Sequence, residues 1–123
     1  MIAAATGMET IFDRQSVLDM VDGEVDFVCE LVELFLNDID AQIDTVKQGV
    51  SAGDASVVQK TCHRLKTSVG NLGGTQARPA VVELEQLARS GTLTGVEPLL
   101  DQFLSELSTF NSALHSFLSE TRG

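Results

Sequence analysis

At 123 residues and 13.2 kDa, the chain has the length of one domain and is too short for two. It is 43% hydrophobic with six Phe and no Trp or Tyr, so aliphatic side chains must form most of the interior, which suits helices packed on helices. The formal net charge of −10 argues against nucleic acid and against an anionic membrane surface as partners, because both would repel the protein.

The first two predicted helices differ in length. Asp13 is suited to cap a short helix over residues 14–21, and an Asp-Gly turn follows it. From residue 24 to about residue 50, apolar side chains recur every three or four positions, as the buried face of one long amphipathic helix requires. These positions are Val25, Val28, Val32, Phe35, Ile39, Ile43, Val46 and Val50.

The next predicted helix has one apolar side as well. Asp54 can serve as its N-cap, and Gly73-Gly74 can end it. Its apolar positions repeat with spacings of four and three: Val58, Cys62, Leu65, Val69 and Leu72. We therefore expect this side of the helix to be buried.

Two more helices complete the predicted fold. Residues 75–89 form a shorter one, and the last begins near Thr94, which has the spacing of a capping box with Glu97. The apolar positions of the two helices are Val81, Leu84 and Ala88, and then Val96, Leu100, Phe103, Leu107, Phe110, Leu114 and Phe117.

These elements predict an all-α fold, an up-and-down four-helix bundle with a short N-terminal helix, because no strand pattern is sustained and the connections are short. Residues 12–123 are expected to form this bundle domain and residues 1–11 an N-terminal arm. The first residues lack the features of a signal peptide, and no run approaches the ~20 apolar residues of a membrane span. A cytoplasmic protein is therefore expected.

Charge is unevenly distributed along the chain. Residues 1–54 hold twelve carboxylates and two cations, a net of −10, and residues 79–123 hold six carboxylates and two cations, a net of −4. Residues 55–78 contain no Asp or Glu and have a net charge of +4. The four cations of this segment are Lys60, Arg64, Lys66 and Arg78. In so acidic a protein, this segment is a candidate functional surface.

His63 is the histidine of this positive segment. At about 100° per residue it lies some 140° around the helix from the apolar positions, so its ring should face outward. We expect cationic, polar or small neighbours, with no carboxylate beside the ring: Gln59, Lys66, Thr67 and Gly70 share this face. Such a face suits a histidine that accepts a phosphoryl group, with Lys66 stabilising the charge. An incidental surface histidine is the alternative reading.

Residues 62–74 carry a family resemblance. Their sequence, Cys-His-Arg-Leu-Lys-Thr-Ser-Val-Gly-Asn-Leu-Gly-Gly, resembles the signature of the histidine-containing phosphotransfer (Hpt) domain, His-x-x-Lys-(Gly/Ser)-Ser followed by Leu-Gly-(Ala/Gly). The resemblance covers roughly residues 12–120 and includes Phe35, Gly53-Asp54, Leu84-Glu85 and Ala88-Arg89.

The resemblance implies a role for His63. It would be phosphorylated on Nε2 by the phosphoaspartate of a receiver domain and would pass the group to another receiver. Lys66 matches the lysine that steadies the phosphoryl oxygens, and Thr67 stands where many members have Gly. The implied partners are response-regulator receiver domains and a sensor histidine kinase, which can be a hybrid one. The domain would be a phosphocarrier and not an enzyme, with no cofactor of its own, since Mg²⁺ belongs to the receiver.

Supporting residues are expected on two helices. Gln59, Arg64, Thr67 and Gly70 surround the histidine on its own helix, and Gln86 and Arg89 on the following helix are expected to orient the ring or touch the phosphoryl group.

A second apolar stripe on the first long helix is a candidate docking surface for the receiver. It consists of Phe27, Leu31 and Leu34. Contact of this stripe with the short N-terminal helix is the alternative.

Other reactive side chains are expected to be structural. Cys29 and Cys62 form no CxxC pair, which argues against a zinc site or a disulfide, and both are expected in the core. Cys62 cannot share a proton well with His63, because adjacent helical residues point about 100° apart. His115 is expected at the surface, without a metal.

Two other functional classes stay open. One is a non-phosphorylated module of the same fold that binds a receiver or kinase. The other is a helical adaptor or homodimer that buries Phe27, Leu31 and Leu34 between subunits, whereas a phosphocarrier is expected to be a monomer.

Overall fold

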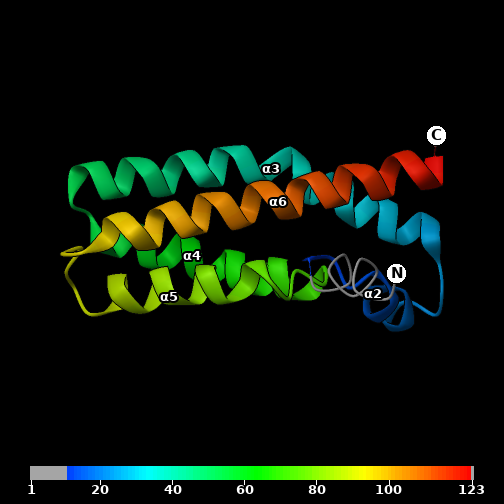
Figure 1. The fold of residues 1–123 in the computed structure, drawn as a ribbon, viewed down its shortest axis with the longest axis horizontal. Coiled ribbons are helices and arrows are strands. Elements are labelled where there is room, and N and C mark those ends of the chain that lie inside the picture. The colour runs from blue at the N-terminus through cyan, green and yellow to red at the C-terminus, as the bar shows by residue number, and fades with distance from the viewer. Residues whose placement is uncertain (1–10, 123) are drawn as a thin grey trace.

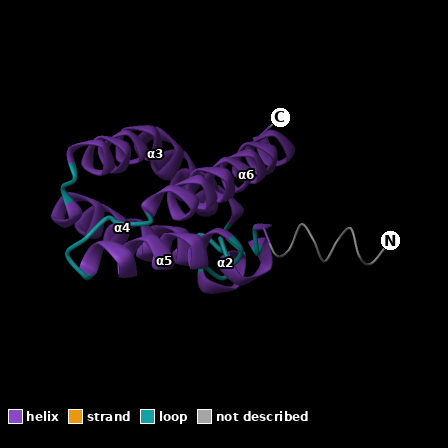
Figure 2. Ribbon diagram, turned by 60° about the vertical axis from the view of Figure 1, so that its left-hand side comes forward, coloured by secondary structure: helices purple, strands orange, loops and turns teal. Residues whose placement is uncertain are grey.

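The computed structural model describes residues 11–122, within which five helices are defined. Their bounds are α2 (Arg14–Met20), α3 (Val25–Ala52), α4 (Ala55–Asn71), α5 (Ala77–Arg89) and α6 (Val96–Arg122). α3 and α6 lie side by side over α4 and α5, and each long helix runs antiparallel to the one before it (Figures 1 and 2). No strand occurs among the described residues. The predicted all-α, up-and-down four-helix bundle with a short N-terminal helix is confirmed.

The helices of the bundle have unequal lengths, and α2 compensates for the difference. α3 and α6 have 28 and 27 residues, whereas α4 and α5 have 17 and 13. At 1.5 Å per residue, the longer pair extends about 40 Å, roughly twice the length of α5. α2 lies at the end that the shorter pair leaves uncovered (Figure 1). Just before α2, the ring of Phe12 packs edge-on against Phe110 and Phe117, at centroid distances of 6.3 and 5.3 Å.

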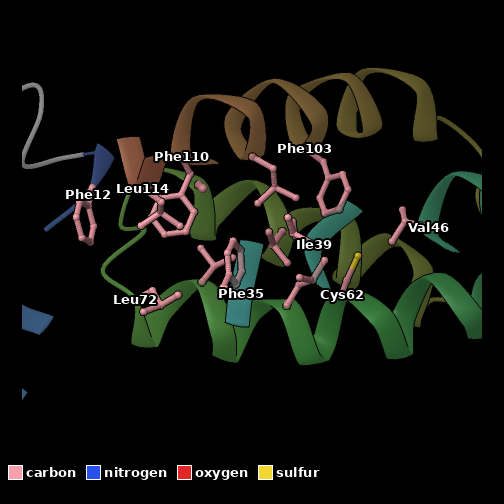
Figure 3. Packing of buried hydrophobic residues seen from close by; sticks show 14 of the residues in the cluster. Phe12, Phe35, Ile39, Val46, Cys62, Leu72, Phe103, Phe110 and Leu114 are labelled. Atoms are coloured by element: carbon pink, nitrogen blue, oxygen red, sulfur yellow. The ribbon is translucent and has the colours of Figure 1, made fainter. Parts of the chain in front are cut away.

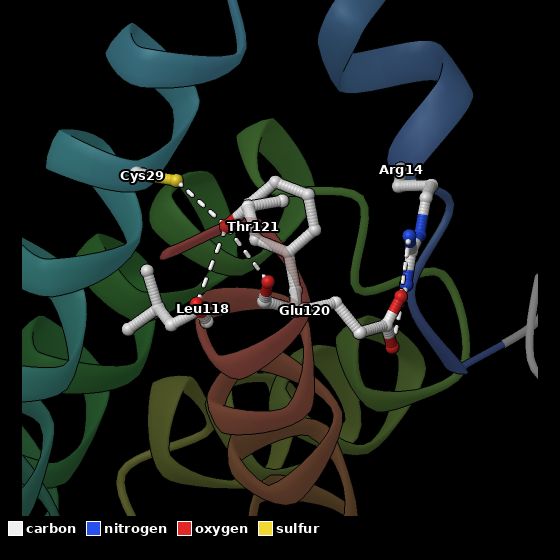
Figure 4. Close-up of polar contacts among 6 residues, drawn as sticks. Arg14, Cys29, Leu118, Glu120 and Thr121 are labelled. Carbon is white, nitrogen blue, oxygen red and sulfur yellow. Dashed lines mark hydrogen bonds and ion pairs between the residues drawn. The ribbon is translucent and has the colours of Figure 1, made fainter. Parts of the chain in front are cut away.

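Polar contacts join the end of α6 to α2 and α3 (Figure 4). Arg14 Nη1 lies 3.2 Å from Glu120 Oε1, and the guanidinium is also 5.2 Å from the centroid of the Phe117 ring. The Thr121 hydroxyl donates to the Phe117 carbonyl at 2.9 Å and lies 3.1 Å from Cys29 Sγ. Exposed ion pairs add little stability, so we infer that these contacts mainly fix where the last turn of α6 sits.

One hydrophobic core runs through the bundle (Figure 3). Every apolar position predicted on α4 and α5 is buried, and so are most of those on α3 and α6. Ile43, Val50 and Leu100 are partly buried against this core. The prediction is wrong for Val25, which is 38% exposed because it is the first residue of α3, at the end of the bundle.

The helix ends follow the predicted capping residues, with one exception. The side chains of Asp13 and Asp54 each accept a hydrogen bond, at 3.2 Å, from the amide three residues further on. The capping box predicted at Thr94 is wrong. α6 begins at Val96, after a glycine with a φ of 78°, and the Thr94 hydroxyl lies 2.9 Å from the hydroxyl of Thr92.

The Gly73-Gly74 turn sets the register between α4 and α5. Gly73 has a φ of 75°, and a Cβ on Gly74 would lie 2.6 Å from Val69 Cγ1 and 3.0 Å from the Phe110 ring. The Asp13 amide donates to the Gly73 carbonyl at 2.8 Å, which ties α2 to the same turn. Because the two helices leave this turn antiparallel, residues equally distant from it in sequence come to face each other.

The residues of the predicted domain that the structure describes, 12–122, form the bundle. The predicted N-terminal arm, residues 1–11, lies outside the described residues apart from Ile11. Among residues 11–122, no helix combines the length and the apolar character that crossing a membrane requires.

The crowding at Gly74 predicts a steric cost. We expect Gly74→Ala to lower the free energy of unfolding by about 1–3 kcal/mol, because Val69 and Phe110 are buried and cannot move freely. Val69→Ala removes the Cγ1 that the new methyl group would meet. The double variant should therefore lose less than the sum of the two single losses, as measured by urea unfolding. Simple additivity would show that the turn is not crowded at this point.

Candidate functional site

His63 lies on the outward face of α4. Its side chain is 58% exposed, as the helical phase predicts, while the apolar positions of the same helix are buried. Thr67, one turn later, is also exposed. The ring is therefore accessible from solvent on the side away from the core.

A buried carboxylate from α5 contacts the ring. Glu85 is 1% exposed, and its Oε2 lies 2.9 Å from His63 Nδ1. The expectation that no carboxylate lies beside the ring is therefore wrong. The positive segment of the sequence lacks Asp and Glu, but α5 packs against it and supplies a carboxylate from outside the segment.

Glu85 holds three further donors in addition to the histidine. Lys66 Nζ lies 2.9 Å from Oε1, Arg89 Nη2 lies 2.7 Å from Oε2, and Gln59 Nε2 lies 3.4 Å from Oε2. The side chain of Lys66 is only 23% exposed, which is less than its predicted place on the outward face beside His63 implies. Its ammonium group is instead engaged with the carboxylate that also contacts the ring.

These donors keep the carboxylate ionised. Burial alone would raise the pKa of the Glu85 carboxyl, but hydrogen bonds from Lys66 and His63, the charge of Lys66 and the Gln59 amide outweigh it and lower this pKa to about 2. At neutral pH, Glu85 is therefore a hydrogen-bond acceptor only, and Nδ1 must be the donor in their contact. In the neutral ring, the other nitrogen, Nε2, then carries the free lone pair.

A shallow concavity lies beside the ring on its solvent side. It has a volume of about 340 Å³ and is lined by Gln59, Lys60, His63, Arg64 and Arg89. Its lining combines three cations with an imidazole and an amide. A tetrahedral oxyanion that approaches Nε2 would meet positive charge and hydrogen-bond donors here.

The other predicted supporting residues take different positions. Gln86 is exposed, and the residue that orients the ring is its neighbour Glu85. Gly70 is exposed and lies next to Arg78: a Cβ there would be 3.2 Å from Arg78 Cδ and Nε. The small size of Gly70 thus makes room for an arginine of α5.

Neither cysteine takes part in the site. Both are free and buried. The pKa of the Cys62 thiol is raised to about 12, mainly by burial and to a smaller extent by the negative charge of Glu85. The thiol therefore stays protonated and unreactive. His115 is exposed, as expected. Among residues 11–122, no group of three or more His, Cys, Asp or Glu side chains is arranged to hold a metal ion.

Comparison with known proteins identifies the family. A sequence profile described as the Hpt domain matches residues 30–117. The chain belongs to the Hpt domain family. A search of curated proteins gives no significant match.

Two solved structures share the fold of this Hpt domain. Histidine-containing phosphotransfer protein B from Pseudomonas aeruginosa PAO1 is 23% identical, with a TM-score of 0.78 over 86% of this chain and 92% of that one. The HPT domain of the Hpt sensor hybrid histidine kinase from Shewanella is 17% identical, with a TM-score of 0.80 over 90% of this chain and 96% of that one. Membership of the Hpt family gives this chain a role in histidine phosphotransfer within a two-component phosphorelay.

The predicted docking stripe of the Hpt domain borders a groove. Leu34 and Phe27 are 66% and 46% exposed, and Leu31 is partly buried. The groove has a volume of about 530 Å³ and runs between α3 and the end of α4, with α2 at its edge. Met20 and Val21, at the end of α2, line the same groove. The stripe is thus partly covered by the N-terminal helix and partly open.

Sequence reasoning missed Glu85 as part of the site, although the sequence contains a signal for it. Glu85 lies four residues after Val81 and three before Ala88, and so falls on the buried stripe of α5. It also lies eleven residues after Gly74, as His63 lies eleven before it. A charged residue on an apolar stripe, opposite a histidine across a tight turn, marks a buried polar contact.

The low pKa of the Glu85 carboxyl predicts how much of the unfolding free energy is lost in acid through protonation of this one group. The ionised carboxylate stabilises the fold above its ordinary pKa of 4.5, and this contribution is lost as pH falls from about 4.5 to 2. Over that range, the wild-type protein should lose on the order of 3 kcal/mol more unfolding free energy than Glu85→Gln, which cannot titrate. Urea unfolding at pH 5, 3.5 and 2 measures the difference. Equal losses in the two proteins would contradict the assignment.

Proposed function

We propose that this Hpt domain carries the phosphoryl group on Nε2 of His63. The observation that carries the proposal is the contact of Nδ1 with the Glu85 carboxylate at 2.9 Å. It assigns the ring's proton to Nδ1 and leaves the Nε2 lone pair free for attack. The 58% exposure of the side chain allows a partner's phosphoaspartate to reach it.

For the transfer, the Hpt domain has to position the His63 ring and to supply positive charge beside it. The Nε2 lone pair attacks the phosphorus of a receiver phosphoaspartate, and as the N–P bond forms, the O–P bond breaks and its electron pair returns to the receiver's carboxylate. Onward transfer reverses these steps with a second receiver. Arg64 and Arg89, which line the concavity, are suited to contact the phosphoryl oxygens. Lys66 adds positive charge beside the ring while it pairs with Glu85.

The partners in this proposal are receiver domains and a sensor histidine kinase, hybrid or separate. The Mg²⁺ needed for transfer is held by the receiver, and the Hpt domain has no cofactor of its own and no ATP-dependent activity. We further propose that the protein works in the cytoplasm as a monomer. Its two free, buried thiols are consistent with a reducing compartment.

The receiver is proposed to dock over α4 and the adjoining groove. The groove reaches α4 at Ser68 and Asn71, on the helix that carries His63. Leu34 and Phe27 offer exposed apolar surface on the opposite wall of the groove. A partner seated on His63 can therefore bury these side chains in the same interface.

Phosphoryl labelling tests the assignment of His63. Receiver domains of the source organism, phosphorylated by acetyl phosphate in the presence of Mg²⁺, should label the wild-type protein and the control variant His115→Gln. His63→Gln should receive no label, because it lacks the nucleophile. Radiolabel on denaturing gels measures the transfer. Equal labelling of His63→Gln and the wild-type protein would refute the proposal, and absence of labelling in all three would favour a non-phosphorylated interaction module.

The docking surface is tested by a variant that leaves the nucleophile intact. Leu34→Ser should slow transfer from a phosphorylated receiver about tenfold, the effect of losing roughly 1.4 kcal/mol of interface contact. Val25→Ser removes another exposed apolar side chain of α3 that does not line the groove, and it should transfer at the wild-type rate. Labelling by the small donor phosphoramidate should be unchanged in both. Equal transfer rates for the two variants would place the receiver elsewhere.

A further inference from the structure

We propose that Glu85 keeps the proton on Nδ1 of phosphorylated His63, so that the ring leaves phosphorus as a neutral imidazole and the phosphohistidine stays a reactive donor at neutral and mildly alkaline pH. The proposal rests on His63 being the phosphoryl carrier. It makes Glu85 a positioning residue that also controls the reactivity of the phosphorylated state.

The protonation of the ring decides how easily the N–P bond breaks. When Nε2 attacks phosphorus while Nδ1 keeps its proton, the ring becomes cationic. When a receiver aspartate later attacks that phosphorus, the electron pair of the N–P bond returns to Nε2, and the leaving group is a neutral imidazole. If Nδ1 had lost its proton, the leaving group would be an imidazolide anion, which is far more basic and leaves more slowly.

Glu85 is placed to hold that proton. Its Oε2 lies 2.9 Å from Nδ1, and its side chain is only 2% exposed, so water screens the attraction poorly. The low pKa of the Glu85 carboxyl, about 2, means that the carboxylate does not take the proton for itself. The positive ring and the carboxylate then form a charge-assisted hydrogen bond.

The cations around the ring act in the opposite direction, since positive charge favours loss of a proton. Two of them are already paired with Glu85: Lys66 at 2.9 Å and Arg89 at 2.7 Å. Lys60 and Arg64 are exposed on α4, where solvent and salt weaken their effect. Phosphorylation also adds a dianion that draws these cations. In this proposal, the direct contact with Glu85 outweighs these cations at Nδ1 of the phosphorylated ring.

His115 provides a matched reference within the same chain. It is an exposed histidine on α6, and no ion pair links it to an acidic side chain among residues 11–122. Potassium phosphoramidate phosphorylates accessible histidines without a protein partner. A His115→Gln variant then reports on phospho-His63 alone, and a His63→Gln variant on phospho-His115 alone.

The experiment measures hydrolysis of each phosphohistidine from pH 5 to 10, with ³¹P NMR to follow the ring's protonation. Hydrolysis of phospho-His63 should stay fast to a pH at least about one unit higher than that of phospho-His115, the shift expected from a carboxylate in direct contact. Adding Glu85→Gln to the His115→Gln background should abolish this difference and slow hydrolysis at pH 8 to 9 several-fold. Arg89→Gln in the same background removes a cation but keeps the carboxylate, and it should not lower the midpoint.

The outcomes separate this inference from the proposed function. Failure of receiver-dependent labelling at His63 refutes the carrier role itself. Normal labelling with equal pH midpoints for phospho-His63 and phospho-His115 overturns the role of Glu85 alone, and this comparison needs no substitution at Glu85. An unchanged midpoint in a folded Glu85→Gln variant, with its helical content confirmed by circular dichroism, overturns it as well.

Discussion

The site depends on one buried charge. A carboxylate taken out of water is costly unless cations and hydrogen-bond donors surround it, and Glu85 is nearly inaccessible to solvent. Its donors come from α5 itself and from three positions on α4. The need to compensate this single charge therefore fixes Gln59, His63 and Lys66 relative to one another. The contact between His63 and Glu85 therefore has two effects. It holds the solvent-exposed ring in place, and it helps to compensate the buried charge of the carboxylate.

The glycine turn connects this requirement to the fold. Gly74 fits closely against Val69 of α4 and Phe110 of α6, and the hairpin register brings His63 opposite Glu85 and Gln59 opposite Arg89, each pair equidistant from Gly74 in sequence. A longer or looser connection would shift one helix along the other. Because a shift of one residue rotates a helical side chain by about 100°, it would take Glu85 away from the ring. The turn is thus a structural feature with a direct chemical consequence.

Most of the fold could be predicted from the sequence, because each helix carries its own periodic apolar face and a local start or stop signal. Asp13 and Asp54 cap the helices they were expected to cap. The site could be predicted only in part. The exposure of His63 follows from the phase of one helix, whereas its contact with Glu85 depends on how two helices pack. The charge of residues 55–78 predicted the positive face of α4. It could not predict the Glu85 carboxylate that α5 places beneath this face, because Glu85 lies outside that segment.

The positive segment therefore has two roles that the sequence alone does not separate. Lys66 is drawn inward to balance Glu85, and Arg78 covers Gly70, while Lys60 and Arg64 remain at the surface beside the ring. A phosphoryl group on Nε2 would place a second negative charge on the opposite side of the imidazole from Glu85. The ring, cationic when phosphorylated, would then lie between two anions, with cations flanking both. In this arrangement, a phosphoryl group would be added to and removed from the exposed side of the ring while the buried Glu85 carboxylate stays in place.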